Sequence, residues 1–571
     1  MTEQYAAGAK EHWFFGPVFR AKHELFQLIL GSVLINIFAL VSAFYIMIVY
    51  DRVIPNEAIE TLYALTIGVM IVVAFDLLMK VLRGLFTDRA GAVVDEEVAA
   101  TLFDRLSRNE ALATQQTGKT ASIVKEFDLL RDFLGSATFV AFADLPFVII
   151  FLFVLYSIGG LVVLVPTIIV VTILLLGLLI QPVLRRLTRN AAIDGQSKQA
   201  VLVEVLSGME TLKTLRGMDI LRHRWMNSVR SQAGFSMKSK FWSQLTSNFS
   251  QTGQQLSQVG IVVFGVFLIM EGSLTMGSLI ACVILSGRTL APLGQISNLL
   301  GRLNQVLTAY DNLNQLMQQP VTEVERSEYL RIHEVEGNIT FSNAGLQYPK
   351  QKKPSADDIS LAIGAGEKVA VLGRIGSGKT TILRMIAGLV QPTSGMVQVD
   401  RTDVSHFHPD DLRKHVSVVM QQPLIFSGTL RQNITLGNPD ATDEEIMHVA
   451  RLTGVDGLAS MLPDGFDTML AERGMQLSGG QRQAICIARA LVNPSKILLL
   501  DEPTSAMDSN TEMAVMKNIM IAAKDKTVIL VTHRGILVDL VERVVVMDSG
   551  KIIADGPREE IKQKLRGGGA A

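Results

Sequence analysis

Six long runs of apolar residues, separated by polar segments, fill the first three hundred positions of the chain. A helix that crosses the hydrocarbon core of a bilayer needs about 20 apolar residues, and each run is close to that length. The runs cover residues 25–50, 62–82, 139–158, 161–184, 249–270 and 274–299. The pattern therefore predicts six membrane-spanning helices.

Basic residues are concentrated in every second connection between these runs. The connections after the second and fourth runs are long and rich in Lys and Arg, whereas Arg52 is the only basic residue between the first and second. Because basic loops stay in the cytoplasm, we expect both termini to be cytoplasmic. Residues 12–20 mix aromatic and basic side chains and predict an interfacial segment, with a disordered tail as the alternative.

The long basic connections have a helical pattern of their own. Leu202, Val205, Leu206 and Met209 follow the i, i+3, i+4, i+7 spacing of one helix face. We therefore expect the membrane helices to continue well into the cytoplasm.

The pattern changes after residue 300. A polar helical segment runs from 302 to 319, and from Gly337 onward short β-rich runs alternate with helical ones, as in an α/β nucleotide-binding domain. The predicted fold is a multi-domain membrane protein, with a six-helix all-α transmembrane domain followed by an α/β P-loop domain. The predicted boundaries are 1–22 for an elbow, 23–318 for the membrane domain, 319–336 for a linker, 337–566 for the nucleotide domain and 567–571 for a tail.

Composition agrees with a protein partly dissolved in lipid. Of 571 residues, 49% are hydrophobic and 19% charged, which is below the usual charged share of about 25%. The formal net charge of -1 leaves no basic excess for binding nucleic acid. The two cysteines, Cys282 and Cys486, lie in apolar surroundings and exclude a disulfide framework or a thiolate zinc site.

A glycine-rich loop lies between a buried strand at 367–372 and a helical stretch that starts with Thr381. Its glycines let backbone N–H groups surround phosphate oxygens, Lys379 adds a positive charge, and the Thr380 hydroxyl can bind Mg²⁺. Strand, loop and helix are the context that a phosphate-binding loop requires. The loop consists of Gly373, Arg374, Ile375, Gly376, Ser377, Gly378, Lys379 and Thr380.

A second buried strand, at 496–500, ends in two carboxylates, Asp501 and Glu502. Asp501 is placed to hold a Mg²⁺ ion that bridges phosphates, and Glu502 to polarise an attacking water molecule. Adjacent acids at a strand end are also common surface features. The phosphate loop upstream favours the functional interpretation.

A second anion-binding turn follows the phosphate loop by about a hundred residues, although a single nucleotide site needs only one. It is formed by Leu477, Ser478, Gly479, Gly480 and Gln481. This pentapeptide is the signature of the ATP-binding cassette (ABC) superfamily, which the chain resembles over nearly its whole length.

The resemblance implies roles for further residues. Tyr348 matches the aromatic residue that stacks on adenine, and Gln421 matches the glutamine that senses Mg²⁺ and couples to the membrane domain. Asp508 lies in the loop that crosses the dimer interface, and His533 matches the histidine that contacts the γ-phosphate. The implied catalytic residues are thus Glu502, His533, Gln421 and Lys379, and the implied cofactors are ATP and Mg²⁺.

One chain with six spans and one cassette resembles a half-transporter of the exporter branch. In this family the signature of one domain completes the ATP site of another, which implies a homodimer, with a heterodimer as the alternative. By the same resemblance, residues 117–127 and 211–221 would be the coupling helices that dock on the nucleotide domains.

Polar residues within the spans bear on what is transported. Gln244, Asn248, Gln251, Gln255 and Gln258 recur along one face of the fifth span. These amides could line a wetted path for a polypeptide or hold helices together. Asp76, Asp144 and Arg288 are ionisable residues in or near spans. They are candidates for substrate contact or for pairing with one another inside the bundle.

A closer resemblance is to type I secretion ATPases that export RTX adhesins and toxins. It rests on residues 12–17, 50–56, 143–146, 287–293 and 373–378. It implies a multi-pass protein of a Gram-negative inner membrane, surrounded by membrane lipid and working with a periplasmic membrane-fusion adaptor and a TolC-like outer-membrane channel. The substrate would be a secreted protein with a C-terminal signal. The alternative is a lipid or drug exporter with the same ATPase mechanism.

Overall fold

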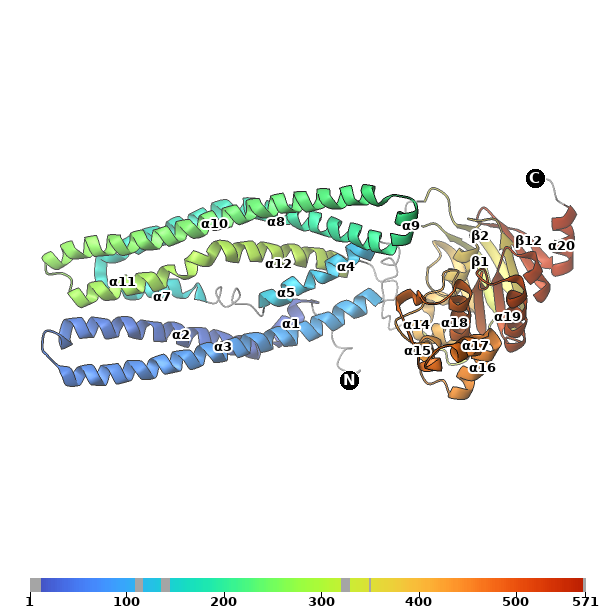
Figure 1. The fold of residues 1–571 in the computed structure, drawn as a ribbon, viewed down its shortest axis with the longest axis horizontal. Coiled ribbons are helices and arrows are strands. Elements are labelled where there is room, and N and C mark those ends of the chain that lie inside the picture. The colour runs from blue at the N-terminus through green and yellow to red at the C-terminus, as the bar shows by residue number, and fades with distance from the viewer. Residues whose placement is uncertain (1–11, 108–116, 135–143, 320–328, 349–350, 568–571) are drawn as a thin grey trace. The chain divides into compact units, whose positions relative to one another are not determined.

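The computed structural model describes residues 12–107, 117–134, 144–319, 329–348 and 351–567. It divides the chain into two compact units, Met1–Thr322 and Glu323–Ala571, each of which is described by itself (Figure 1). We call them the membrane unit and the ATP-binding unit.

The membrane unit is built from helices. In chain order they are α1 (Phe15–Arg20), α2 (Lys22–Ile48), the π-helix η2 (Val49–Val53), α3 (Ile59–Ser107), α4 (Thr117–Lys125), α5 (Phe127–Leu134), α7 (Phe147–Gly159), the 3₁₀ helix η4 (Gly160–Val163), α8 (Leu164–Ser207), α9 (Met209–Thr214), α10 (Met218–Met270), α11 (Met276–Leu290), the 3₁₀ helix η5 (Pro292–Gln295) and α12 (Ile296–Met317). The prediction of an all-helical membrane domain is confirmed.

Four helical stretches of the described chain are long and apolar enough to cross a membrane: Lys22–Val53, Ile59–Ser107, Phe147–Ser207 and Met218–Met270. The third contains the predicted spans 139–158 and 161–184, which are joined by a turn where Gly160 adopts a φ of +55°. The first residues of span 139–158 lie outside the described residues.

The sixth predicted span, 274–299, is wrong as one continuous helix. α11 ends at Leu290, η5 follows from Pro292, and α12 begins at Ile296. Proline has no backbone N–H and clashes with the preceding turn, so an α-helix does not run through this position undisturbed. Hydropathy alone could not predict this interruption, because it lies within a continuous run of apolar residues.

Three helices extend far beyond a bilayer core. α3 has 49 residues, α8 has 44 and α10 has 53. At 1.5 Å per residue, α10 alone is roughly 80 Å long, against about 30 Å of hydrocarbon. The expected continuation of the membrane helices is therefore present. The stretches predicted as coupling helices form α4 and α9 with the start of α10; their docking stays a prediction.

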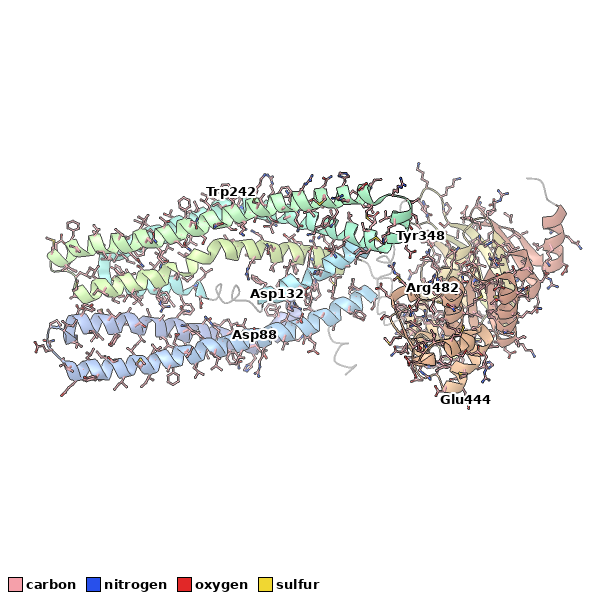
Figure 2. All side chains as sticks on the ribbon, in the orientation of Figure 1. Asp88, Asp132, Trp242, Tyr348, Glu444 and Arg482 are labelled. Carbon is pink, nitrogen blue, oxygen red and sulfur yellow. The ribbon has the colours of Figure 1, made fainter. Side chains whose placement is uncertain are left out.

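The long helices of the membrane unit pack in pairs. α2 lies beside α3, and α8 lies beside α10 along much of its length (Figure 1). Ala43, Leu155, Ile261 and Leu285 form one buried cluster. Many apolar side chains of α3, α8 and α10 project outward, as expected of lipid-facing helices (Figure 2).

The described part of the aromatic segment before α2, from His12, packs against other helices of the membrane unit. The Trp13 indole N–H donates to Asn314 Oδ1 at 3.0 Å, and its ring stacks on Tyr310 with centroids 5.8 Å apart. Phe14 is buried against Val98 and Leu313. For the described part of this segment, the disordered-tail alternative is wrong.

Two of the three ionisable residues singled out in the spans, Asp144 and Asp76, are paired, but with other partners than expected, while the exposed Arg288 makes no ion pair within the described residues. Asp144 accepts from Asn36 at 3.0 Å and from Arg83 at 3.3 Å. Asp76 pairs with Lys80 at 2.6 Å. Arg83 and Lys80 lie at or just beyond the end of the second predicted span, so the sequence assigned Arg83 to the cytoplasmic loop.

The ATP-binding unit is an α/β fold with two main sheets. Its strands are β1 (Ile339–Leu346), β2 (Ala356–Ile363), β3 (Lys368–Gly373), β4 (Ser394–Val399), β5 (Thr402–Asp403), β6 (Val416–Val419), β7 (Gly428–Thr429), β8 (Met469–Leu470), β9 (Ile497–Asp501), β10 (Thr527–Val531), β11 (Arg543–Asp548) and β12 (Lys551–Pro557). Its α-helices are α13 (Lys379–Ile386), α14 (Pro409–His415), α15 (Leu430–Thr435), α16 (Asp443–Thr453), α17 (Val455–Met461), α18 (Gly479–Val492), α19 (Ser509–Ala522) and α20 (Arg558–Gly567).

The larger sheet has the strand order β12-β11-β3-β10-β9-β6, and the smaller has the order β2-β1-β4-β5. β10 pairs in parallel with both β3 and β9, and β6 pairs in parallel with β9. Every residue of β9 and of β10 is buried, which is why both strands read as continuous apolar runs. The carboxyl ends of β3, β10, β9 and β6 therefore meet at one edge of the sheet.

Candidate functional site

The phosphate loop begins at the carboxyl end of β3 and leads into α13, as predicted. A Cβ at Gly373 would lie 2.3 Å from the carbonyl oxygen of Met547. At Gly378, where φ is +97°, a Cβ would lie 2.1 Å from the carbonyl oxygen of Ser355. Such approaches exclude any side chain, so glycine is required by packing as well as by backbone conformation.

Lys379 lies across the loop. Its Nζ donates to the carbonyl oxygens of Gly373 and Arg374, each at 2.8 Å, and approaches Ser377 Oγ at 3.4 Å. Burial lowers its pKa, while Glu502 and Asp501 act in the opposite direction. The ammonium group is thus positioned by neutral oxygens that a phosphate could replace. Ile375, at the tip of the loop, is fully exposed.

A hydroxyl and a carboxylate meet beneath the loop. Thr380 Oγ1 donates to Asp501 Oδ2 at 2.8 Å, which joins the start of α13 to the end of β9. Asp501 is 2% exposed, and burial raises its pKa, whereas the bond from Thr380 lowers it. Mg²⁺ prefers oxygen ligands and usually takes only one or two carboxylates beside phosphates and water. This donor pair fits such an ion.

Glu502 is held from two sides. Gln421 Nε2 donates to Glu502 Oε2 at 3.1 Å, and His533 Nδ1 lies 2.9 Å from Glu502 Oε1. Gln421 follows β6 and His533 follows β10, the two strands that flank β9. Glu502 itself adopts a φ of +47°, a strained conformation for a non-glycine residue. Three strand ends thereby fix the direction of one carboxylate.

The signature turn begins α18. Ser478 Oγ accepts from the backbone N–H of Gln481 at 3.2 Å, and Gln481 Oε1 accepts from the N–H of Ser478 at 2.8 Å. These side-chain bonds stay within the turn, while Leu477 is buried. Within a single chain, these bonds therefore join the turn only to itself, and its binding of an anion stays a prediction.

The glycines of the signature lie against the loop 505–508. A Cβ added at Gly479 would lie 3.0 Å from Ala506 Cβ, and one at Gly480 would lie 3.3 Å from the Ala506 carbonyl oxygen. Asp508 caps α19 by accepting from Thr511 and Asn510, each at 3.1 Å, and these bonds, led by the one from Thr511, lower its pKa.

Tyr348, labelled in Figure 2, is half-buried and packs against a buried apolar cluster that includes residues of both main sheets. Its hydroxyl makes no hydrogen bond within the described residues. Its stacking on adenine stays a prediction.

Two functional candidates were missed by the sequence analysis, Gln483 and Arg534, and both hold the loop 505–508. Gln483 Nε2 donates to Ser505 Oγ at 2.8 Å, and Gln483 Oε1 accepts from the N–H of Ala506 at 2.9 Å. On the other side, Arg534 donates to the Ser505 carbonyl oxygen at 3.1 Å. Gln483 lies two residues after the signature and Arg534 directly follows His533, which are the only sequence signals that could have pointed to them.

Arg534 is in turn held by a buried carboxylate. Glu512, 1% exposed, accepts from Arg534 Nη1 at 2.6 Å and from Thr504 Oγ1 at 2.8 Å. A carboxylate at this depth is stable because both of its oxygens are bonded. The loop between Glu502 and the start of α19 is therefore positioned by side chains on two sides, Gln483 and Arg534.

Comparison with known proteins agrees with this geometry. Residues 356–505 match the family described as ABC transporter, and residues 25–293 match the ABC transporter transmembrane region. The chain is 31% identical over 566 residues to the toxin RTX-I translocation ATP-binding protein of Actinobacillus pleuropneumoniae, covering 96% of this chain and 78% of the relative. It is 30% identical over 561 residues to the leukotoxin translocation ATP-binding protein LktB of Mannheimia haemolytica, covering 97% and 78%.

Among solved structures, a bacterial Atm1-family ABC exporter with ATP bound is similar, with a TM-score of 0.84 and 22% identity. The similarity covers 96% of this chain and 99% of that one. At this identity it supports the fold alone.

Proposed function

The chain belongs to the ABC transporter family and is an ATPase coupled to transport, and we propose that it is the motor of a type I secretion system that exports an RTX-type protein. As a multi-pass membrane protein with the fold of an ABC exporter, it acts as a dimer, as its relatives imply. The observation that carries the proposed substrate is the similarity to two toxin-translocating proteins along almost the whole chain.

The proposed setting follows from the same relatives. We place the protein in the inner membrane of a Gram-negative bacterium, with both termini cytoplasmic. It would be a homodimer working with a periplasmic membrane-fusion adaptor and a TolC-like outer-membrane channel. The basic loops after the second and fourth predicted spans support this orientation.

The proposed ATPase chemistry uses groups that the chain already positions. The backbone N–H groups of residues 373–381, the loop with the start of α13, bind the phosphates of ATP, and Lys379 exchanges its carbonyl contacts for phosphate oxygens. Thr380, Asp501 and Gln421 would hold Mg²⁺, which neutralises developing charge on the phosphates when bound.

Glu502 then accepts a proton from the attacking water molecule, since its carboxylate is fixed between Gln421 and His533. His533 keeps Glu502 oriented and, in the closed dimer, contacts the γ-phosphate. Ser478, Gly479 and Gly480 of the second copy supply the opposite wall of the site. Tyr348 stacks on adenine, and Asp508 lies at the interface of the two cassettes.

The decisive experiment is secretion in a Gram-negative host that supplies an adaptor and an outer-membrane channel. The substrate is an RTX-type protein, tested with and without its C-terminal segment, and Glu502→Gln serves as the inactive transporter. We expect export only of the complete substrate by the unaltered transporter. Purified protein whose ATPase activity is stimulated by lipids or drugs, but not by the C-terminal segment, would establish the lipid or drug exporter instead.

A further inference from the structure

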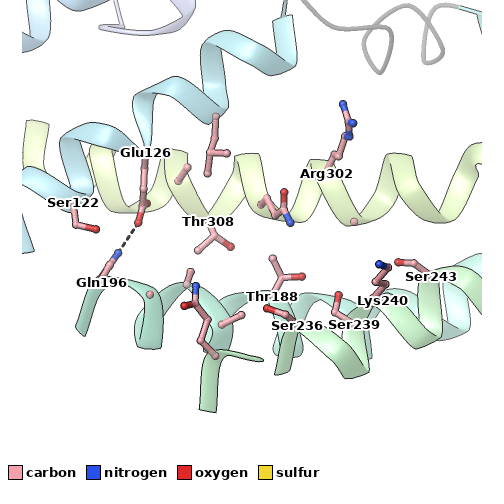
Figure 3. A pocket seen from close by; sticks show the side chains of 18 residues that line it. Ser122, Glu126, Thr188, Gln196, Ser236, Ser239, Lys240, Ser243, Arg302 and Thr308 are labelled. Atoms are coloured by element: carbon pink, nitrogen blue, oxygen red, sulfur yellow. Dashed lines mark hydrogen bonds between the residues drawn. The ribbon is translucent and has the colours of Figure 1, made fainter. Parts of the chain in front are cut away.

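A polar cavity of about 860 Å³ lies inside the membrane unit (Figure 3). Its walls come from α4, α5, α8, α10 and α12. The α8 and α10 residues that line it, between 188 and 196 and between 232 and 243, fall just outside the predicted spans 161–184 and 249–270. The cavity thus lies where the fourth and fifth spans continue beyond the membrane, on the side that the basic loops mark as cytoplasmic.

The lining is unsuited to a drug or a lipid tail. Half of its 18 residues carry a hydroxyl or an amide, and Leu129 is the single large apolar side chain among them. None of its described lining residues is aromatic. Sites for drug-sized ligands are lined mainly by hydrophobic and aromatic side chains. A ligand that fits here must offer many uncharged donors and acceptors.

Several of these polar groups have no partner in the described part of the chain. Ser236, Ser239 and Ser243 lie on one face of α10 toward α12 and make no side-chain hydrogen bond there, nor does Gln305 on α12 (Figure 3). A hydroxyl and an amide can each both donate and accept. An extended polypeptide presents one N–H and one C=O at almost every residue, which is the complementary pattern.

The charges of the cavity lie at opposite ends. At one end, Glu126 accepts from Gln196 at 2.7 Å and from Asn312 at 2.8 Å, so both of its oxygens are bonded. At the other end lies Lys240, beside Ser243, with no ion pair among the described residues (Figure 3). Arg302 is the second cation of the lining. The cationic end therefore favours an acidic side chain or a terminal carboxylate.

The polar surface continues into the membrane along α10. The amides that the sequence analysis singled out begin at Gln244, directly after Ser243, and proceed through Asn248, Gln251 and Gln255. All four are exposed, and their side chains make no hydrogen bond in the described chain. The cavity and these amides together form a polar route along one helix.

We propose that this cavity binds an extended, acidic polypeptide segment of the exported protein through its backbone groups and passes it to the amides of α10. This inference rests on the proposed function, because it assumes a polypeptide substrate. It adds where the polypeptide is bound and which charge it carries there.

The test uses the full chain in lipid nanodiscs and a fluorescent peptide of about 15 residues made of Gly, Ser, Asn and Asp, with binding followed by anisotropy. Replacing two hydroxyls in Ser239→Leu/Ser243→Leu should weaken binding about tenfold, as expected for two lost hydrogen bonds. Lys240→Glu should weaken binding of the acidic peptide by a similar factor and should strengthen binding of a peptide that has Lys in place of Asp. Met237→Leu, an exposed α10 position outside the lining, should change nothing.

A second measurement covers the case in which the leucine variant misfolds. A peptide carrying a thiol-reactive group should couple to Ser239→Cys far more than to Met237→Cys. Equal coupling at both positions, or equal peptide affinity in all folded variants, would overturn the cavity assignment. If an RTX-type protein is nevertheless secreted, the proposed function stands and only the cavity assignment fails. If the peptide binds as expected but no RTX-type protein is secreted, the cavity assignment stands and the proposed function fails.

Discussion

The two units of the chain differ in whether their functional polar side chains are hydrogen-bonded. In the ATP-binding unit, the site residues are bonded by the same chain: Thr380 to Asp501, and Gln421 and His533 to Glu502. In the membrane unit, the amides of α10 from Gln244 to Gln255 face outward without partners in the described residues.

The difference fits the proposed function, in which one unit recognises a nucleotide and the other a polypeptide. A nucleotide has fixed geometry, so strand ends and bonded side chains can be set in advance, and the cost of orienting them is met during folding. The proposed substrate, a polypeptide in transit, has no fixed geometry, and a surface of unbonded hydroxyls and amides can exchange partners with each of its successive residues. On this proposal, pre-organisation characterises the nucleotide site, and adaptability characterises the unbonded side chains of α10.

The largest expected effect comes from breaking the pre-organised site. Glu502→Gln retains the size of the side chain but cannot accept a proton from water. We expect turnover to fall about 10²–10⁴-fold, the usual contribution of general base catalysis, while ATP binding persists. Steady-state ATPase rates and nucleotide affinity measure the two effects. Glu444→Gln, an exposed position on α16, is the matched control (Figure 2). Turnover equal to the unaltered protein would refute the assigned role.

A smaller effect is expected from the residues that position the loop 505–508. Gln483→Leu removes the bonds to Ser505 and Ala506. Two lost hydrogen bonds correspond to roughly tenfold in rate, and we expect kcat to fall by about that factor, with little change in KM for ATP.

Rescue distinguishes positioning from a general loss of stability. Gln483→Glu still accepts from the N–H of Ala506, and the Ser505 hydroxyl can donate to it, so it should recover part of kcat. A fall in thermal stability that parallels the fall in kcat, with no rescue by Glu, would show that Gln483 is only structural.

The site residues whose positions depend on local geometry could be predicted from the sequence. The phosphate loop could be found because Gly373 and Gly378 are required where any Cβ would meet backbone atoms. Asp501 and Glu502 could be found because they end a buried apolar strand. The contacts of Gln483 and Arg534 with Ser505 could not, since they depend on how α18 and the segment after β10 pack around one loop.

The membrane unit was less predictable. Hydropathy indicates how long and how apolar a helix is, but it does not show where a helix is interrupted or which side chains form ion pairs and hydrogen bonds. The interruption at Pro292 lies inside an apolar run, and Asp144 pairs with Arg83, which the sequence assigned to a loop. The amides of α10 were found by their spacing, but their two possible roles could not be separated without knowing which of them are bonded.

One pair tests whether the membrane unit contains pre-organised charges as well. Arg83→Met leaves Asp144 without its cation in a site where the two side chains are 16% and 23% exposed. Discounted for this exposure, we expect a loss of about 2 kcal/mol in stability. Arg83→Met/Asp144→Leu should recover at least half of it, measured by thermal unfolding in detergent. A double variant no more stable than the single one would show that the pair contributes through packing and not through charge.

The smallest expected effect separates a transport path from interhelical bonding. Gln251 is exposed and unbonded, so Gln251→Ala should change stability by no more than about 0.5 kcal/mol. Gln258 is half-buried, with Nε2 3.8 Å from where a Cβ of Gly287 on α11 would lie, and Gln258→Ala should cost about 1 kcal/mol. Both variants are compared by thermal unfolding and by the concentration at which the dimer dissociates. If Gln251→Ala destabilises the protomer or the dimer as much as Gln258→Ala does, the amides hold helices together. In that case the membrane unit is as pre-organised as the ATP-binding unit.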